Sequence, residues 1–179
     1  MNSLLLSLAA LSTAALLTVS AQQKHDDAFS STTIDIGMVV SDIEASAKFY
    51  GGTLGFQEVP GFAVPADFCT DAGLTDNLPL TIRVFKLGEG DNATKLKLMQ
   101  IEGAKPKSGD NSFIHSQLGL SYLTVYISDT TYVLAHLADA KIDVLGQGPV
   151  AIGTGDKVPY LTVVRDPDGN LIELIGPKL

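Results

Sequence analysis

Two stretches of the chain alternate apolar and polar residues and then reach a Ser-Asp pair. The first covers residues 33–42 (TIDIGMVVSD), and the second covers residues 118–129 (LGLSYLTVYISD). Alternation is typical of a β-strand with one buried face, and Ser or Asp is typical of a helix N-cap. Each stretch therefore predicts a strand that leads directly into a helix.

Apolar residues at helical spacing follow each of these stretches. In the first half, Ser41 and Glu44 match a capping box, and Gly55 marks the end of the predicted helix. In the second half, either Ser128 or Asp129 is the predicted N-cap. The sequence thus predicts one amphipathic helix after each strand.

Three strand-like segments follow each predicted helix. They cover residues 56–59, 80–87 and 94–101 in the first half, and residues 142–145, 158–164 and 170–175 in the second. Residues 166–170 (DPDGN) predict a turn between the last two strands. The order β-α-β-β-β therefore occurs twice, which predicts an α+β fold of two tandem modules.

A long connection, residues 61–77, interrupts the first half. Pro65 can open a short helix there and Gly73 can close it, and the segment is too apolar for a free loop. Two interpretations stay open at this point. The segment is either a lid over a cavity or a short helix that packs on the core.

The N-terminal segment is an apolar run that lies outside the repeat. Residues 4–19 are mostly apolar, and Val19-Ser20-Ala21 suits cleavage by a signal peptidase after Ala21. We expect residues 1–21 to be a signal peptide, residues 22–32 a polar linker and residues 33–177 the folded domain. The mature protein is then exported, periplasmic or extracellular, without stable insertion in a membrane.

Composition and charge limit the partners. The chain has 179 residues, of which 45% are hydrophobic and 18% charged, which is enough to build a core and too apolar for a disordered chain. The net charge of −8 argues against nucleic-acid binding, which needs clustered Lys and Arg. Cys69 is the single cysteine, so neither an intrachain disulfide nor a CxxC zinc site can form.

Several segments, in this order, resemble the vicinal oxygen chelate superfamily, which includes glyoxalase I, bleomycin-resistance proteins and extradiol dioxygenases. They are residues 35–42 (DIGMVVSD), 49–50 (FY), 54–56 (LGF) and 164–174 (VRDPDGNLIEL). The resemblance implies two βαβββ modules, residues 33–103 and 118–177. Their curled mixed sheets would enclose one cavity, with the helices outside. The resemblance also implies a small-molecule ligand and is compatible with a homodimer.

In the metal-using members of this superfamily, four inward side chains on the first and last strands of the modules bind one divalent ion. The resemblance places Asp35, Lys97, Tyr122 and Glu173 at these positions. Strand alternation independently puts each of them opposite apolar neighbours. A protonated lysine has no lone pair and a phenol is a poor ligand, so we expect no cofactor, with a divalent metal as the alternative. The Lys97 ammonium can instead pair with both carboxylates while Tyr122 donates to one of them.

Two further residues complete the expected ligand-binding set. Arg83 and Phe85 alternate with apolar residues on one predicted strand. We expect them either on the cavity face, where they would bind an anionic or aromatic ligand, or on a solvent-exposed strand face.

The residues indicate a metal-free, exported protein that binds a small molecule. The alternative is a metal-dependent lyase, isomerase or dioxygenase of the same superfamily, in which Glu173 acts as the catalytic base and Asp35 as a metal ligand. A third interpretation is a structural protein whose cavity is filled by its own side chains. All three stay open on the sequence alone.

Overall fold

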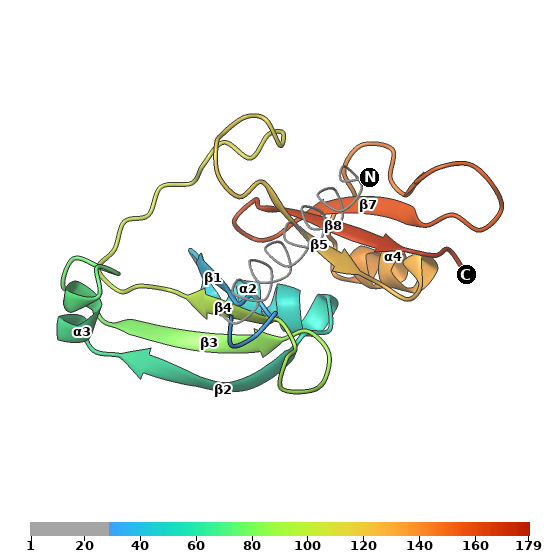
Figure 1. The fold of residues 1–179 in the computed structure, drawn as a ribbon. Helices are drawn as coiled ribbons and strands as arrows, with labels where there is room; N and C mark the ends of the chain where they lie inside the picture. Colours follow the sequence, from blue (N-terminus) through green and yellow to red (C-terminus); the bar gives the residue numbers. More distant parts are fainter. Residues whose placement is uncertain (1–28) are drawn as a thin grey trace, which may run out of the picture. The chain divides into compact units, whose positions relative to one another are not determined.

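The computed structural model describes residues 29–179 (Figure 1). The predicted signal peptide, its cleavage point and the first part of the linker lie outside these residues. Residues 29–34 contain no helix or strand, and residues 35–179 form one structural unit. Within the described part of the chain, no helix is long and apolar enough to cross a membrane.

The first module has the predicted βαβββ order with an added short helix. Its strands lie in the order β1-β4-β3-β2, with β1 parallel to β4 and the other neighbours antiparallel. The elements are β1 (Ile36–Val39), α2 (Ile43–Ala47), η1 (Lys48–Thr53), β2 (Gln57–Val64), α3 (Ala66–Asp71), β3 (Leu80–Lys86) and β4 (Lys95–Met99).

The N-cap of α2 differs from the prediction by one residue. The carboxylate of Asp42 accepts hydrogen bonds from the backbone amides of Glu44 and Ala45. Ser41 instead donates its own backbone N–H to Asp168 of the second module. The capping box predicted at Ser41 is therefore wrong, because Asp42 holds the extended backbone from which a side chain can reach the first turn.

The second module repeats the arrangement. Its strands lie in the order β5-β8-β7-β6, again with only the first pair parallel. The elements are β5 (Tyr122–Tyr126), α4 (Thr130–Asp139), β6 (Val150–Ala151), β7 (Tyr160–Arg165) and β8 (Leu171–Gly176). The predicted α+β fold of two βαβββ modules is confirmed.

Two local predictions in the second module have different outcomes. Asp129 caps α4 by accepting a hydrogen bond from the amide of Thr131, as one of the two predicted caps. Residues 142–145 form no strand, however, and the short β6 pairs with β7 in that place. The alternation at residues 142–145 reflects the packing of Ile142 and Val144 against the core rather than a strand ladder.

One hydrophobic core contains residues of both modules. It is formed by the sides of the two sheets that face the helices, together with residues from α4 and η1. Burying each large apolar side chain stabilises the fold by roughly 1.5–3 kcal/mol, so this cluster holds the two modules together. Its largest fully buried members are Tyr50, Phe85, Leu96, Leu98, Leu137, Ile172 and Leu174.

The connection predicted at residues 61–77 is shorter in the structure. Strand β2 continues to Val64, with a bulge between Val59 and Phe62, and α3 follows directly after Pro65. Cys69 of α3 is fully buried in a second apolar cluster that includes Ile82 and Val84 of β3. Thus α3 packs on one end of the first sheet, which supports the interpretation of a core-packing helix.

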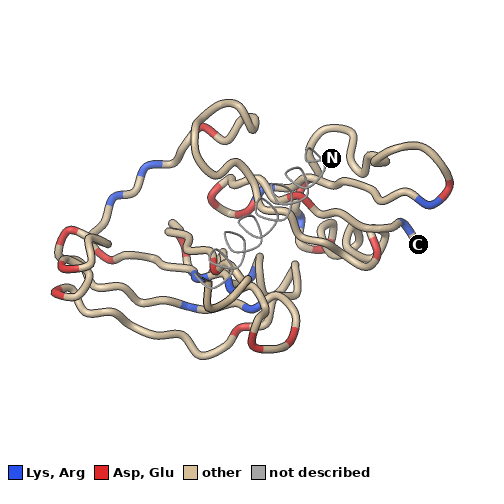
Figure 2. Tube along the Cα trace, in the orientation of Figure 1, with Lys and Arg blue, Asp and Glu red and all other residues tan. Residues whose placement is uncertain are grey.

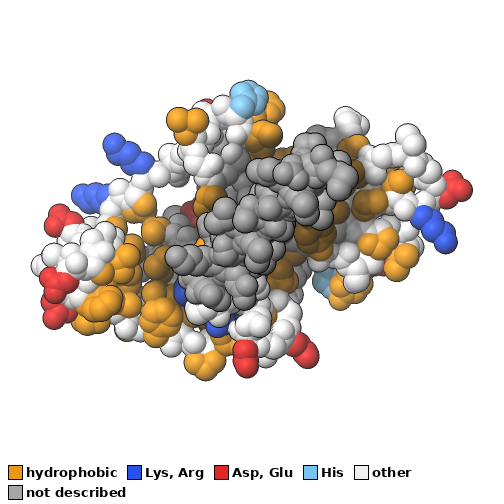
Figure 3. Space-filling view, viewed as in Figure 1, with side chains coloured by type: hydrophobic (Ala, Val, Ile, Leu, Met, Phe, Trp, Pro, Cys, Tyr) orange, Lys and Arg blue, Asp and Glu red, His pale blue; other side chains and the backbone are white. Residues whose placement is uncertain are grey.

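The surface around α3 is both acidic and apolar. Acidic residues gather at α3, and a second acidic group lies at the β3–β4 loop at the other end of the first sheet (Figure 2). Hydrophobic side chains also gather over α3 and the adjoining ends of β2 and β3 (Figure 3). The exposed large ones in this region are Phe62, Phe68 and Leu74.

Candidate functional site

The four residues predicted at the site lie on or beside the strand faces opposite the shared core. Lys97 lies between two fully buried leucines of β4, and Glu173 lies between two fully buried residues of β8. Since side chains alternate along a strand, both point away from the shared core and from the helical segments that contribute to it, η1 and α4. The register pairs Lys97 with Gly37 of β1 and Glu173 with Thr124 of β5. We call these sheet faces the open face.

The charged groups of the open face form two separate pairs. Lys97 Nζ lies 2.9 Å from Asp35 Oδ2, with about a third of each side chain exposed. Glu173 Oε2 accepts a hydrogen bond of 2.8 Å from Thr124 Oγ1 and has no ion-pair partner among residues 29–179. The predicted arrangement differs, because it placed the ammonium between both carboxylates and made Tyr122 a donor. Thr124, rather than Tyr122, is the register partner of Glu173.

A pocket of about 230 Å³ separates these two pairs. It lies between β1 and β5, which are the edge strands of the two sheets. Gly37, which pairs with Lys97 in the register of β1 and β4, lines one wall, and Tyr122 lines the other. The order across the open face is therefore β4, β1, pocket, β5, β8. The lining residues are Ile36, Gly37, Met38, Val39, Leu120, Ser121, Tyr122, Leu123, Asn170 and Leu171.

The side chains at the four positions do not fit a divalent metal ion. The ammonium of Lys97 offers no lone pair, and it already engages the carboxylate of Asp35. Across residues 29–179, no group of three or more His, Cys, Asp or Glu side chains could hold a metal ion. No step of a metal-assisted reaction follows from this set of donors.

Arg83 and Phe85 lie on the core side of the first sheet, which α2 and η1 cover, and not on the open face. Phe85 is 1% exposed within the shared core. Arg83 bonds to Glu58 of β2 at 2.7 and 2.9 Å and to Glu44 of α2 at 2.9 Å. The hydrogen bonds to Glu58 raise the pKa of Arg83 and lower the pKa of Glu58. Alternation shows that the two residues share a face, but only the tertiary structure shows which face α2 covers.

Sequence reasoning missed two residues of the open face. Thr124 bonds to Glu173, and Tyr126 is 79% exposed at the end of β5. Both point to the same side of β5 as Tyr122, because they are two and four residues further along the strand. The alternation that located Tyr122 could therefore also have located them.

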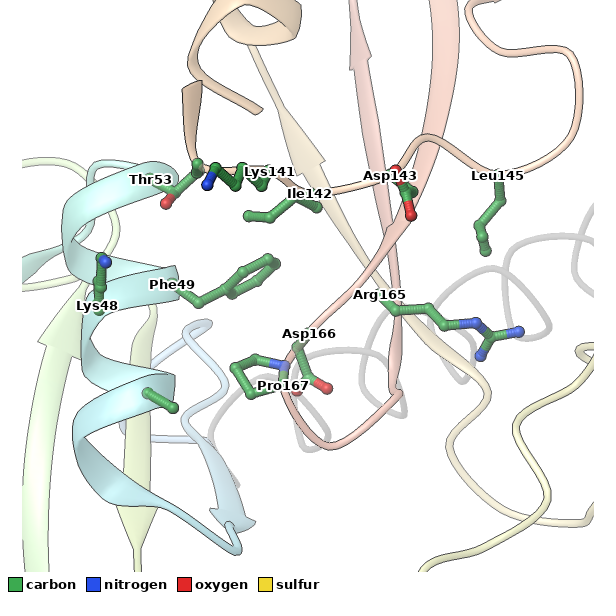
Figure 4. A pocket seen from close by; sticks show the side chains of 12 residues that line it. Lys48, Phe49, Thr53, Lys141, Ile142, Asp143, Leu145, Arg165, Asp166 and Pro167 are labelled. Atoms are coloured by element: carbon green, nitrogen blue, oxygen red, sulfur yellow. The ribbon is translucent and has the colours of Figure 1, made fainter. Parts of the chain in front are cut away.

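A second pocket, of about 450 Å³, lies on the helix side between the two modules (Figure 4). The side chains of Phe49 and Ile142 point into it from opposite modules, and Asp166 and Pro167 of the β7–β8 turn lie below them. None of the site residues predicted from the sequence lines this pocket. Its walls come from the segments that hold the two modules together.

The Asp35–Lys97 pair predicts a measurable pH effect. The hydrogen bond from Lys97 holds the pKa of Asp35 below its ordinary value, against the opposing effect of burial. Because the pKa of Asp35 is lower in the folded protein, the pair stabilises the fold above the unfolded pKa of Asp35, and this stabilisation is lost as the pH falls through the folded pKa.

We expect Lys97→Met to raise the pKa of Asp35 in an NMR titration. Lys95→Met, which removes only a weaker attraction, should raise it less. An unchanged titration in Lys97→Met would show that the pair does not form in solution.

The comparisons with known proteins agree with this fold and with the sequence resemblance. The family model described as the Glyoxalase/Bleomycin resistance protein/Dioxygenase superfamily matches residues 33–174. The chain belongs to this superfamily. A search of curated proteins found no match to the sequence.

Solved structures of glyoxalase family proteins share the fold at low sequence identity. A glyoxalase family protein from Bacillus cereus is 15% identical, with a TM-score of 0.65 and coverage of 83% of this chain and 95% of that one. The trypanothione-dependent glyoxalase I of Leishmania major is 19% identical, with a TM-score of 0.54 and coverage of 82% and 87%. A glyoxalase/dioxygenase from Nostoc punctiforme is 22% identical, with a TM-score of 0.53 and coverage of 81% and 90%. At these identities the likeness establishes the fold alone.

Proposed function

We propose that this protein is an exported member of the superfamily that binds a small molecule without a metal ion. The ligand site is the pocket between β1 and β5 on the open face. The observation that carries the proposal is the Lys97–Asp35 ion pair, which stands where metal-using members place two of their ligands. A cation already present in the chain thus neutralises one of the two carboxylates.

The pocket has the chemistry of a ligand site. Its walls are mostly aliphatic, with Tyr122, Ser121 and Asn170 as polar groups that can orient a ligand. Its volume of about 230 Å³ is below the roughly 300–1,000 Å³ of sites for drug-sized ligands, so the ligand is small. The apolar run of residues 4–19 and the cleavage sequence at Ala21 support export.

The metal content of the purified protein tests the proposal. We expect no near-stoichiometric zinc, manganese, nickel or iron by mass spectrometry, either as isolated or after incubation with each ion. The intact mass of the same sample should equal that of a chain whose first residue is Gln22. Near-stoichiometric metal would overturn the proposal in favour of a metal-dependent lyase, isomerase or dioxygenase, with Glu173 as base and Asp35 as ligand.

A charge-reversal variant makes the same test sharper. Lys97→Glu places a second carboxylate beside Asp35, so we expect it to gain binding of Mn²⁺ or Ni²⁺ in calorimetry. Lys105→Glu makes the same charge change in the segment between the modules and should gain none. Equal metal binding by the two variants would mean that Lys97 does not stand at a ligand position.

A further inference from the structure

We infer that the ligand is a small organic cation, an amine or quaternary ammonium that carries an apolar group. Glu173, Tyr122 and Tyr126 recognise its positive charge, and the pocket between β1 and β5 holds its apolar part. This inference rests on the proposed function, and it specifies the chemical class of the ligand.

Glu173 supplies a negative charge that the described residues do not neutralise. Among residues 29–179, Glu173 forms no ion pair and accepts a hydrogen bond from the neutral hydroxyl of Thr124, whereas Asp35 on the other side of the pocket is neutralised by Lys97. The closest arginine along the neighbouring strand β7 is Arg165, two residues beyond the register partner of Glu173. Its guanidinium donates to backbone carbonyls instead, at 2.6 to 3.1 Å. A cationic ligand would therefore meet a carboxylate without a competing charged partner.

Two tyrosines flank this carboxylate on the same face. Tyr122 and Tyr126 lie two residues on either side of Thr124, the register partner of Glu173. Neighbouring strands lie about 4.8 Å apart and a parallel strand rises about 3.3 Å per residue, so a neighbour two residues along is about 8 Å away, within reach of an aromatic side chain. Tyr122 is 46% exposed and Tyr126 is 79% exposed, so their ring faces are available to a ligand. Aromatic faces attract cations, and a carboxylate between two rings adds a full negative charge.

The rest of the site selects against anions and favours an apolar group next to the charge. Tyr122 lies near the carboxylate of Glu173 and also lines the pocket, so one ligand can contact the carboxylate and the pocket wall at the same time. The wall continues with the aliphatic side chains of Ile36, Leu123 and Leu171. The net charge of −8 attracts cations and repels anions over longer distances.

Binding of three matched aromatic compounds tests this inference. They are benzyltrimethylammonium, neutral benzyl alcohol and anionic benzoate, each titrated into the ¹⁵N-labelled protein as purified and followed by NMR. We expect the cation to shift the amides of residues 36–39 and 120–126 saturably. Its Kd should be at least tenfold lower than that of the alcohol or of benzoate.

Single substitutions assign the charge recognition to residues. Glu173→Gln should raise the Kd of the cation about tenfold and leave the Kd of the alcohol unchanged. Tyr126→Leu, at a position where the side chain is largely exposed, should raise the Kd of the cation about threefold. Glu89→Gln removes the same charge from the exposed β3–β4 loop and should change neither Kd.

The outcomes separate this inference from the proposed function. If the alcohol or benzoate binds at the same amides as tightly as the cation, the inference is wrong while the pocket remains a ligand site. An unchanged Kd of the cation in folded Glu173→Gln also overturns it. If none of the three compounds shifts these amides, both the inference and the proposed pocket fail.

Discussion

Replacing Asp166 by alanine is expected to lower the free energy of unfolding by about 3 kcal/mol or more. Asp166 is 5% exposed, and its carboxylate accepts four hydrogen bonds. Two come from the backbone amides of Asp168 and Asn170, one from the Asn170 side chain, and one, of 2.8 Å, from the hydroxyl of Tyr50. Tyr50 belongs to the first module, so this carboxylate joins the modules as well as closing the β7–β8 turn.

The expected loss of stability in Asp166→Ala is large because the groups that donate hydrogen bonds to Asp166 stay in place after their acceptor is removed. Tyr50 is fully buried, and burial together with Asp166 raises the pKa of its phenol, so the hydroxyl stays protonated and needs an acceptor. Urea unfolding followed by circular dichroism measures the effect. Tyr50→Phe removes the donor and leaves Asp166 three of its hydrogen bonds, so it should cost only about 1 kcal/mol. Similar losses in the two variants would mean that the carboxylate is not the centre of this network.

Gly61→Ala is expected to lower the free energy of unfolding by about 3 kcal/mol, the upper end of the usual cost of overpacking. Gly61 lies in the bulge of β2, between Val59 and Phe62. A Cβ atom there would overlap the backbone carbonyl oxygen of Ile82 on the neighbouring strand. Backbone cannot rotate away as a side chain can, so either the strand pair separates or the bulge changes register.

Gly52→Ala is the matched control for this prediction. A Cβ at Gly52 would meet only the Lys48 side chain, at 3.8 Å, which is ordinary contact. Because alanine also favours helix over glycine, we expect the stability of this variant to stay unchanged or rise by up to about 1 kcal/mol. Denaturant melts of the two variants side by side measure the difference. Equal stability of the two would show that β2 does not approach β3 at Gly61 as closely as described.

The repeated pattern of strand, helix and three strands was determined by the sequence itself. Alternation in residues 33–42 and 118–129, and the turn at residues 166–170, depend on neighbours in the chain, so they can be recognised without tertiary structure. The same is true of Lys97 and Glu173. Each lies between two apolar residues of its strand, and this local pattern assigns both to the side opposite the core.

The tertiary structure decided what depends on contacts between distant segments. Arg83 and Phe85 share a face by alternation, but the packing of α2 and η1 on that face makes it the core side. Gly61 belongs to a strand rather than a loop because β3 lies beside it. Thr124 bonds to Glu173 because the parallel register of β5 and β8 aligns them, 49 positions apart in the chain. Residue patterns along a chain fix the local geometry and the side-chain parity, whereas pairing partners and covered faces are fixed only when the whole chain packs.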